Sequence, residues 1–404
     1  MTDDSSSLPL SGIRVLDAAT FIAAPYAAAI MGEFGAEVIK IEQPGTGDPF
    51  RKFGTASARD DSSLAWLSEA RNKKSLTLNL KDPRGAKILT DLTAKADVLC
   101  ENFRPGTLEK WGLGWSVLSA ANPGLVMLRI TGYGQTGPYK DRPGFARVAH
   151  AFGGLTYLAG EVGGPPVTPG STSLGDYMSG LYGAIGVLIA LRHRDQTGEG
   201  QVIDLALFES VFRVLDEIAP AYGVANIVRE REGTGALNAC PHGHFPTLDG
   251  EYVAIACTTD KMFERLARAM DRPNLANEDV FGLAAERLSV RDTVNRLVSE
   301  WTRRRTRSTV MELCLEFEVP CAPVNSIADI FADPHFAARE TILMMADEVL
   351  GTIPVPGVVP KLSQTPGQVN DLGPALGADT DTILQSWLNL NDGDIATLRA
   401  DGVI

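Results

Sequence analysis

Short apolar runs alternate with amphipathic stretches along the first half of the chain, and the alternation is regularly spaced. GIRVLDAA (12–19) and GAEVIKIE (35–42) have the length and the β-branched content of strands. The Ala-rich stretch between them, from Pro25 to about Phe34, favours a helix. A strand, a helix and a strand within about thirty residues make a βαβ unit, which requires a parallel sheet.

The same pattern recurs further along the chain and extends the predicted sheet. A helix is predicted over 83–96, and further strands are predicted over 74–80, 97–103, 125–132 and 201–208, with an amphipathic helix after the last one that continues to about Pro220. Strands that alternate with helices in this way are typical of an open α/β sheet with helices on both faces. We therefore predict an α/β protein whose large, Rossmann-like domain covers residues 1–221.

The pattern changes near residue 222 and predicts a second domain. A predicted loop over 229–250 leads to a strand at 251–257, and helices are predicted over 260–271, 290–305 and 307–318. We assign 222–330 to a smaller α+β domain. Residues 331–404 are predicted to form an extended, Pro-rich connector that returns to the large domain and ends in a short helix near 379–389.

Composition narrows the class of protein. The 404 residues carry a formal net charge of −13, which disfavours a general nucleic-acid-binding protein. The five cysteines form no CxxC pair, which indicates buried free thiols rather than a disulfide framework or a zinc ribbon. The start, MTDDSSSLPL, lacks the features of a secretory signal, and no uncharged apolar run reaches the roughly 18 residues of a membrane span. We expect a soluble, cytoplasmic protein with no membrane or nucleic-acid partner.

Familiar cofactor, metal and hydrolase motifs are missing or incomplete. Glu42 ends the second predicted strand, as the acid of a dinucleotide-binding unit does, but the turn TFIAAPYAAA holds no GxGxxG. His242 and His244 flank Gly243, yet no nearby carboxylate or cysteine has metal-ligand spacing. No GxSxG elbow and no P-loop occurs. We expect no bound metal and no permanently bound cofactor.

Two basic clusters, RNKKSLTLNLK (71–81) and NFRPGTLEK (102–110), adjoin the ends of predicted strands. Ligands of open α/β sheets bind at the carboxyl ends of the strands. Isolated surface charges, however, are usually only solvated. The residues alone therefore leave two interpretations open: solvated surface, or phosphate contacts for a small anionic ligand.

One acid, Asp176, stands at the head of a long apolar helix in STSLGDYMSGLYGAIGVLIALRHR (171–194). An acid at a helix start accepts orphan backbone N–H groups, so local reasoning favours a plain N-cap. The helix behind it is apolar on every side and is predicted to be buried, and Gly180, Gly183 and Gly186 would let another backbone approach. The alternative is a carboxylate that a rigid helix end positions for covalent catalysis.

Eight stretches of the chain carry a resemblance to a known family. In order and at similar spacing, they resemble the class III coenzyme A transferases, the formyl-CoA transferase/CaiB-BaiF family, over nearly the whole length. The stretches are LSGIRVLDAAT, GAEVIKIEQPGTGDPFR, RNKKSLTLNLKDPRG, ENFRPGTLEKWGLGW, RITGYGQTGP, STSLGDYMSGLYGAIG, TGEGQVIDLALFES and VPCAPVNSI.

The resemblance implies a fold, an assembly and a set of site residues. It implies an interlocked homodimer of chains that each have a Rossmann-like large domain and a small domain. Asp176 takes the position of the family nucleophile. The family's CoA contacts fall on Ile22, Ala23, Gln43, Leu78, Asn79, Leu80, Lys81, Asn102, Phe103, Arg104, Lys110, Arg142 and Phe145. Ile22 and Gln43 differ from the residues of some members, and Ala378 replaces a histidine of the usual GEHT or GQHT motif.

The resemblance also implies an activity. The Asp176 carboxylate would attack an acyl-CoA thioester, and an aspartyl anhydride and an aspartyl-CoA thioester would relay CoA to an acceptor carboxylate without ATP or metal. The sequence resembles members that use succinyl-CoA with dicarboxylates such as malate, citramalate or glutarate somewhat more than those that use formyl-CoA with oxalate. The rival activity is α-methylacyl-CoA racemisation, which needs a second base where this chain has Gly144-Phe145-Ala146; His150 lies further on in a predicted helix. A third interpretation is a non-catalytic acyl-CoA-binding protein.

Overall fold

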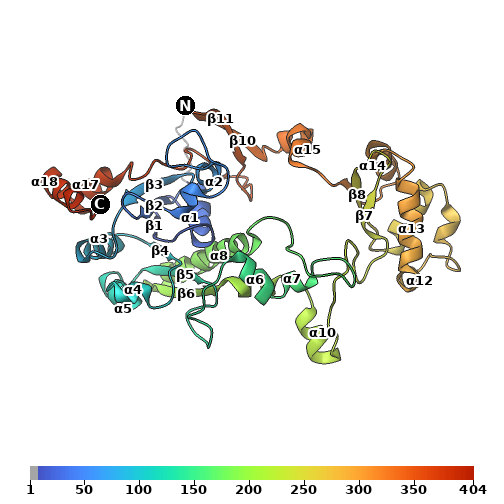
Figure 1. Ribbon diagram of the computed structural model, residues 1–404, viewed down its shortest axis with the longest axis horizontal. Coiled ribbons are helices and arrows are strands. Elements are labelled where there is room, and N and C mark those ends of the chain that lie inside the picture. Colours follow the sequence, from blue (N-terminus) through green and yellow to red (C-terminus); the bar gives the residue numbers. More distant parts are fainter. Residues whose placement is uncertain (1–7) are drawn as a thin grey trace. The chain divides into compact units, whose positions relative to one another are not determined.

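The computed structural model describes residues 8–404, which form two compact units. The first unit comprises residues up to 155, 169–219 and 337–404, and the second comprises 156–168 and 220–336 (Figure 1). The division lies close to the predicted boundaries after 221 and 330. It differs in one respect, because a short insertion at 156–168 joins the second unit although it precedes α8 in the chain.

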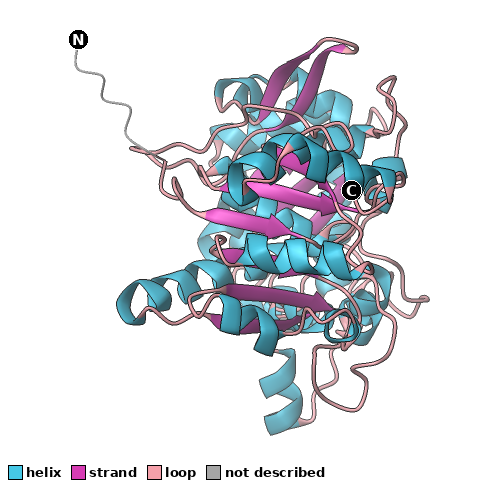
Figure 2. Ribbon diagram, turned by 90° about the vertical axis from the view of Figure 1, so that its left-hand side faces the viewer, coloured by secondary structure: helices cyan, strands magenta, loops and turns pink. Residues whose placement is uncertain are grey.

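A six-stranded parallel sheet forms the centre of the first unit, in the order β3-β2-β1-β4-β5-β6. Its strands are β1 (Arg14–Asp17), β2 (Glu37–Glu42), β3 (Lys73–Thr77), β4 (Val98–Glu101), β5 (Val126–Thr131) and β6 (Gln201–Ala206). Five of the six lie within runs predicted as strands, β3 begins one residue before the predicted run 74–80, and every neighbouring pair is parallel. Figure 2 shows the strands of this unit side by side among the helices that cover them. The predicted α/β fold class is therefore confirmed for this unit.

Helices cover both faces of the sheet because the buried side chains of each strand alternate in direction. On one face, Val15 and Val38 pack under α1 (Ala23–Glu33) and α8 (Leu174–Thr197). On the other face, Leu16 and Ile39 pack under α3 (Pro83–Thr93). Shorter elements fill the connections: η1 (Pro49–Lys52), α2 (Leu64–Glu69), α4 (Thr107–Lys110), α5 (Trp115–Ala121), α6 (Ala146–Phe152) and α9 (Leu207–Arg213). α7 (Leu155–Leu158) lies at the boundary, and all of it except Leu155 belongs to the second unit.

Glycines in α8 let α1 and the sheet approach closely, as the sequence predicts. A Cβ added to Gly180 would lie 2.7 Å from the carbonyl oxygen of Ala23, and one added to Gly183 would lie 3.0 Å from Leu128. Both distances are shorter than ordinary contacts, so α8 requires glycine at these positions. The close contact with Ala23 places the first turn of α1 against α8 and brings the ends of the two helices together.

The prediction that α8 is buried on all sides is wrong for this chain taken alone. Leu181, Ile185, Leu188 and Ile189 are between 44% and 65% exposed, and their spacing puts them on one face. By length and composition α8 is also the one candidate membrane span among residues 8–404, although no apolar run had been expected to reach that length. Its contacts with α1, β5 and β6 are those of a helix that covers a sheet.

The carboxyl ends of β1 and β4 form the switch point of the sheet. From β1 the chain continues to β2 and β3 on one side, and it then returns to the other side of β1 to form β4, β5 and β6. The segments that leave β1 and β4 therefore diverge, which opens a crevice at their carboxyl ends. This crevice is where a ligand of a doubly wound sheet is expected.

The C-terminal part of the chain is more structured than the extended connector that the sequence predicts. β10 (Ile342–Asp347) and β11 (Gly351–Pro356) form an antiparallel hairpin, and α17 (Thr380–Leu388) and α18 (Asp392–Ala400) follow. Ile353 and Val355 of the hairpin pack with Trp66 and Leu67 of α2, while Ile383 and Leu384 of α17 pack with the core beside α3. The sequence did not predict β11 because it contains Pro354 and Pro356, and proline is uncommon in strands that are not at an edge.

The second unit is built on a three-stranded antiparallel sheet, β7-β8-β9, which supports the predicted α+β class. Its strands are β7 (His242–Pro246), β8 (Tyr252–Ala256) and β9 (Cys321–Pro323). Its helices are α11 (Asp260–Ala269), η2 (Pro273–Ala276), α12 (Ala284–Ser289), α13 (Arg291–Thr302), α14 (Arg307–Glu316) and α15 (Ile327–Ala332). α10 (Ile218–Ala225) and α16 (Pro334–Ala338) lie where the chain passes between the units.

Two sequence predictions need correction near the second unit. The stretch 229–250 is not entirely a loop, because His242–Pro246 forms β7; His242 and His244 had been assigned to the loop. The helix after β6 does not continue to Pro220, since α9 ends at Arg213 and α10 is separate. All five cysteines are free, and four of them are buried, as expected.

Candidate active site

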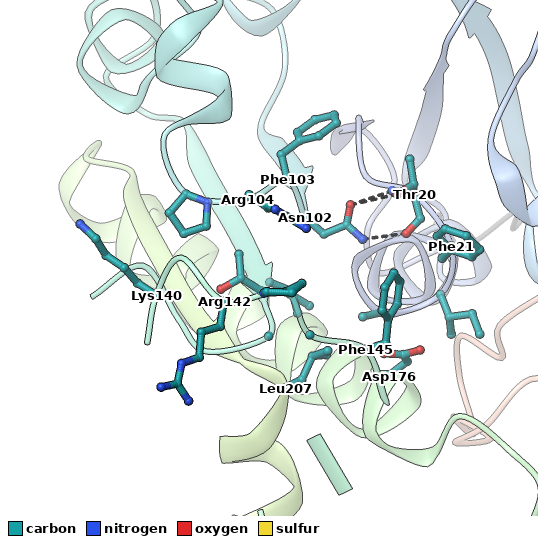
Figure 3. Close-up of a pocket in the computed structure, with 18 residues that line it drawn as sticks. Thr20, Phe21, Asn102, Phe103, Arg104, Lys140, Arg142, Phe145, Asp176 and Leu207 are labelled. Atoms are coloured by element: carbon teal, nitrogen blue, oxygen red, sulfur yellow. Dashed lines mark hydrogen bonds between the residues drawn. The ribbon is translucent and has the colours of Figure 1, made fainter. Parts of the chain in front are cut away.

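A pocket opens at the carboxyl ends of β1, β4 and β5, in the crevice at the switch point (Figure 3). The segments after β1 and β4 form one wall, and the loop that follows β5 forms the other. Asp176 and Leu207 close it from the first turns of α8 and α9. The lining residues are Thr20, Phe21, Ile22, Ala23, Asn102, Phe103, Arg104, Pro105, Ile130, Thr131, Gly132, Lys140, Arg142, Pro143, Gly144, Phe145, Asp176 and Leu207.

Asp176 is not the N-cap of α8, so the interpretation that local reasoning favoured is wrong. The helix begins at Leu174 with Ser173 as its N-cap residue, and Asp176 is the third residue of the helix. The Asp176 N–H donates to the carbonyl of Ser173 at 2.9 Å. Within residues 8–404 the Asp176 carboxylate has no recorded hydrogen bond or ion pair, so its oxygens are free for a ligand.

Burial changes the acidity of this carboxyl group. Desolvation raises the pKa of Asp176 from 3.8 to about 6, and no cationic side chain contributes to lower it. At pH 7 about nine-tenths of the groups are therefore still ionised. A poorly solvated carboxylate that makes no hydrogen bond is more reactive toward an electrophile than one that water or an arginine stabilises.

The backbone just before Asp176 is held from two sides. The Gly175 N–H donates to Nε2 of His150 at 2.8 Å, and the Ser179 hydroxyl donates to the Gly175 carbonyl at 2.7 Å. His150, on α6, and Ser179 are both almost completely buried. The first turn of α8 is thus fixed by side chains beneath the pocket rather than by solvent.

A hydrogen-bonded clasp fixes the wall between β1 and β4. The Asn102 amide nitrogen donates to the Thr20 carbonyl at 2.7 Å, and its oxygen accepts from the Thr20 N–H at 2.8 Å (Figure 3). Asn102 is one of the predicted CoA contacts. Its side chain, however, is mainly occupied with the backbone of Thr20, so its role in the structure is to join the two strand ends that form the crevice.

Phe21 lies next to this clasp in a backbone conformation that is unusual for a bulky residue, with φ at 61°. The Asp48 carboxylate supports the conformation by accepting from the Phe21 N–H at 3.1 Å. The Phe21 ring contacts Phe145 and Phe53 edge to face, with ring centroids 6.1 and 6.3 Å apart. An aromatic wall thus lies beside Asp176, and Figure 3 shows Phe145 next to that carboxylate.

A buried ionic network supports the wall from below. Lys40 lies 2.9 Å from Asp48 and 3.7 Å from Asp17, while Lys73 donates to Asp17 at 2.9 Å. Burial alone would lower the pKa of Lys40, but the neighbouring carboxylates, Asp17 first, raise it above its ordinary value. Lys40 therefore stays charged, and its ion pair with Asp48 holds that carboxylate in place under Phe21.

Cationic side chains line the pocket away from Asp176. Arg104, Lys140 and Arg142 are exposed there, and the Arg142 guanidinium lies over the Tyr139 ring at 3.6 Å. Figure 3 shows Lys140 and Arg142 on the opposite side of the pocket from Asp176. Three cations and one carboxylate line the pocket, so it can hold a phosphate-bearing ligand whose reactive end reaches Asp176.

Seven of the thirteen predicted CoA contacts line this pocket with Asp176: Ile22, Ala23, Asn102, Phe103, Arg104, Arg142 and Phe145. The other six do not line it and remain predictions: Gln43, Leu78, Asn79, Leu80, Lys81 and Lys110. Gln43 and 78–81 directly follow β2 and β3, at the same edge of the sheet. The side chains of Leu78 and Leu80 are buried in the core, so only their backbone can contact a ligand.

Sequence reasoning missed several lining residues. Phe21 had no signal, because its role depends on a left-handed φ that only the structure reveals. Thr131 has a buried hydroxyl with no hydrogen-bond partner among residues 8–404, which also leaves no trace in the sequence. Lys140, in the Gly/Pro-rich stretch after β5, could have been found as the cation nearest to Arg142.

The structure also shows what the first basic cluster and Glu42 do. Lys73 is buried in the ionic network, and Arg71 forms a buried ion pair with Glu33 at 2.6 Å, so these two cations are not available for phosphate. Glu42 is paired with Arg51 at 2.6 Å and is not a ribose ligand. Across residues 8–404 no group of three or more His, Cys, Asp or Glu side chains is arranged to hold a metal.

Comparison with known sequences identifies relatives along the whole chain. The sequence model of CoA-transferase family III matches residues 10–380. The alpha subunit of succinyl-CoA–L-malate CoA-transferase from Chloroflexus aurantiacus is 58% identical over 98% of this chain and 93% of its own length. The beta subunit is 58% identical over 100% of both chains. The human succinyl-CoA:glutarate CoA-transferase is 33% identical over 100% of this chain and 91% of its own.

Solved structures show the same fold. A CaiB/BaiF family protein from Brucella suis has a TM-score of 0.84 and 31% identity, and the match covers 94% of this chain and 100% of that one. A protein from Mycobacterium tuberculosis has a TM-score of 0.81 and 28% identity over 93% of this chain and 99% of its own. These matches extend over most of both compact units.

Proposed function

This chain belongs to CoA-transferase family III and is a CoA-transferase, and we propose that it transfers CoA from succinyl-CoA to a small dicarboxylate through Asp176. The observation that carries the proposal is the geometry of Asp176. It is a carboxylate without a partner among residues 8–404, at a fixed helix end and in a pocket whose other charged groups are cations.

The proposed reaction is a covalent relay in four steps. The Asp176 carboxylate attacks the thioester carbon of the donor, which forms a mixed anhydride and releases CoA thiolate. The thiolate attacks the aspartyl carbonyl of the anhydride, which forms an aspartyl-CoA thioester and releases the donor acid. The acceptor carboxylate attacks this thioester and forms a new anhydride with release of thiolate. The thiolate then attacks the acceptor acyl carbon and frees Asp176.

Each group of the pocket has a part in this scheme. Arg104, Lys140 and Arg142 would bind the phosphates of CoA and hold the thioester toward Asp176. Phe21 and Phe145 would cover the anhydride on its apolar side, since water must be excluded while an activated acyl group is present. Thr131, whose hydroxyl has no partner among the described residues, can donate to an oxygen of the ligand.

The choice of substrates rests on the relatives. Two of them, each 58% identical, are named succinyl-CoA–L-malate CoA-transferase subunits, and a more distant one is named for glutarate. All three names contain succinyl-CoA and a short dicarboxylic acid. We propose succinyl-CoA as the donor and L-malate as the first acceptor to test, in the cytoplasm and without a permanently bound cofactor.

The geometry disfavours racemisation. A two-base racemase needs a second proton acceptor across the substrate from Asp176. The residues at the expected place are Gly144 and Phe145, and His150 does not line the pocket because its Nε2 faces the Gly175 N–H. The pocket lining therefore holds no histidine within residues 8–404.

We also propose that the chain assembles as an interlocked homodimer. The exposed face of α8, formed by Leu181, Ile185, Leu188 and Ile189, is an apolar surface on a helix whose other side covers the sheet. Exposed apolar patches of this kind are typical of protein–protein interfaces. A second copy would bury the face, which accounts for a sequence that is apolar all round the helix.

The function is tested by a transfer assay. Purified protein is mixed with succinyl-CoA and one of L-malate, citramalate, glutarate or formate, and the CoA esters are separated by chromatography. We expect a new acyl-CoA with L-malate and none with the variant Asp176→Ala. Transfer by Asp176→Ala at the rate of the native enzyme would contradict the proposal, and uptake of solvent deuterium at the α-carbon without any acceptor would indicate a racemase.

The assembly is tested separately by light scattering. We expect the native chain to have twice the mass of one chain, and Ile185→Asp to reduce it to one. Ile185→Leu, which keeps the surface apolar, is the matched control and should remain a dimer. A native protein of single-chain mass would contradict the proposed homodimer and would leave the proposed chemistry untouched.

A further inference from the structure

His150 is a buried titratable group to which the proposed chemistry gives no part. It lies on α6, is 1% exposed, and makes one hydrogen bond with residues 8–404: its Nε2 accepts from the Gly175 N–H at 2.8 Å. Because Nε2 accepts, the proton of the neutral ring is on Nδ1. That Nδ1 is buried and has no partner among residues 8–404.

Such an arrangement costs stability, so the ring must be present for what Nε2 does. A buried donor without a partner destabilises the fold, and a leucine at this place would avoid the penalty. The positive charge that would come with a second proton is opposed as well, since burial first and then Arg147 lower the pKa of His150. The ring is therefore kept neutral, with its one lone pair directed at Gly175.

The Gly175 N–H belongs to the first turn of α8, where no carbonyl of the helix precedes it by the three or four residues that a helical hydrogen bond needs. The usual solution is a side-chain cap, but Ser173 at the N-cap position makes no such hydrogen bond. His150 supplies the missing acceptor from another helix. Ser179 holds the carbonyl of the same residue, so both peptide planes of Gly175 are fixed.

The residue type at 175 is part of the arrangement. A Cβ on Gly175 would lie 3.2 Å from two atoms of the His150 ring, closer than most real contacts. The ring thus occupies the space in which a side chain would otherwise stand, directly beside the residue that precedes Asp176. A shift of the ring moves the peptide from which the Asp176 carboxylate is presented.

We propose that His150 is a positioning residue for Asp176: through Nε2 it caps the start of α8 and so fixes where the nucleophilic carboxylate stands in the pocket. The inference rests on the proposed role of Asp176 as nucleophile. It assigns His150 no contact with substrate and no proton transfer, in agreement with its absence from the lining of the pocket.

The test compares two substitutions at one position. His150→Leu removes the acceptor and keeps the volume, whereas His150→Gln offers a carbonyl oxygen that can accept from the same N–H. Thr93→Val is the matched control for stability, because Thr93 is also buried and donates to a backbone carbonyl at 2.8 Å, but on α3 away from the pocket. All variants are measured as full chains for kcat, KM and thermal midpoint.

We expect His150→Leu to lower kcat about 10- to 100-fold, as a misplaced catalytic group does, with the KM for acyl-CoA changed less than about threefold. His150→Gln should recover most of the loss. Thr93→Val should lower the thermal midpoint and keep kcat. Three results would each overturn the inference. They are a native kcat in His150→Leu, equal losses of kcat in His150→Leu and His150→Gln, and a kcat in Thr93→Val that falls as far as in His150→Leu.

Hydrogen exchange at Gly175 separates this inference from the proposed function. The N–H should exchange at least about tenfold faster in His150→Leu than in the native chain or in His150→Gln, whatever reaction the protein catalyses. Unchanged protection in His150→Leu would overturn the positioning role while Asp176 could still be the nucleophile. Conversely, faster exchange in His150→Leu, together with no transfer activity in the native chain, would overturn the proposed function alone.

Discussion

Replacing Asp176 with asparagine should make the protein more stable while it abolishes transfer. Asparagine has nearly the same shape as aspartate but carries no charge. Burial raises the pKa of Asp176 from 3.8 to about 6, which means that the folded chain holds the carboxylate less readily than water does. The proposed reaction requires the ionised form, which explains why an aspartate stands here in spite of this cost in stability.

The magnitude follows from the two pKa values. The folded state binds the proton more tightly than the unfolded state, so the free energy of unfolding falls as the pH rises from 3.8 through 6. At pH 8 the full shift of about 2 units costs the native protein at most about 3 kcal/mol, and at pH 5 about half of that. Asp176→Asn carries neither cost.

Urea denaturation at pH 5 and pH 8, at one protein concentration, measures the effect. The advantage of Asp176→Asn over the native chain should be larger at pH 8 by on the order of 1 kcal/mol. Any local change in packing or hydrogen bonding that the substitution causes is the same at both pH values and cancels in the comparison. Asp347→Asn is the control: backbone N–H groups, Leu350 first, lower the pKa of Asp347, so it stays ionised over this range and its effect should not vary.

One result would refute the reasoning. If the difference between Asp176→Asn and the native chain is the same at pH 5 and pH 8, the carboxyl group is not destabilised by burial. The interpretation of Asp176 as a poorly solvated nucleophile would then fail, even if the variant is inactive.

Two further perturbations test the support and the mouth of the pocket. Lys40→Met should lower the free energy of unfolding by about 3–5 kcal/mol in a thermal or urea assay, because it leaves Asp48 and Asp17 buried with one cation fewer. The control Lys361→Met removes an exposed ion pair with Glu340 and should lower the free energy of unfolding by less than about 1 kcal/mol. Arg104→Ala should raise the KM for acyl-CoA about tenfold in steady-state kinetics with kcat nearly unchanged. The control Arg399→Ala, on α18, should leave both values as they are. A fall in kcat alone for Arg104→Ala would contradict its role in binding.

The sheet could be predicted from the sequence because its strands are short apolar runs separated by clear helices. Val15 and Leu16 illustrate why: both faces of the strand are buried, so consecutive residues are apolar. The hairpin β10–β11 could not be predicted, because its prolines and half-exposed residues give no strand pattern. Its position is determined by packing on Trp66, nearly three hundred residues earlier in the chain.

Part of the site could also be predicted, because its residues follow directly after strands that the sequence indicates clearly. Asp176 and the residues directly after β1 and β4 lie where an open sheet binds ligands, and the family resemblance points to the same positions. The role of Asn102 as a clasp and that of Phe21 as a wall depend on single hydrogen bonds and on one backbone angle. Neither leaves a periodic signal in the sequence.

The helix α8 shows how local reasoning can be correct in kind and wrong in detail. An acid was correctly predicted near the start of a helix, but the helix begins two residues earlier than Asp176, and the Gly175 N–H donates to His150 rather than to an acid. Burial all round was predicted from composition alone. The structure leaves one apolar face of the helix exposed, and this is the face that the proposed homodimer would bury.

The most direct test of the central claim is to trap the acyl group on Asp176. The protein is incubated with succinyl-CoA, treated with hydroxylamine, digested and analysed by mass spectrometry. We predict a hydroxamate on Asp176 that forms only when succinyl-CoA is present. In His150→Gln the yield of this hydroxamate should fall no further than kcat does. A fully active protein in which Asp176 remains unmodified, with the label absent or on another residue, would contradict the account.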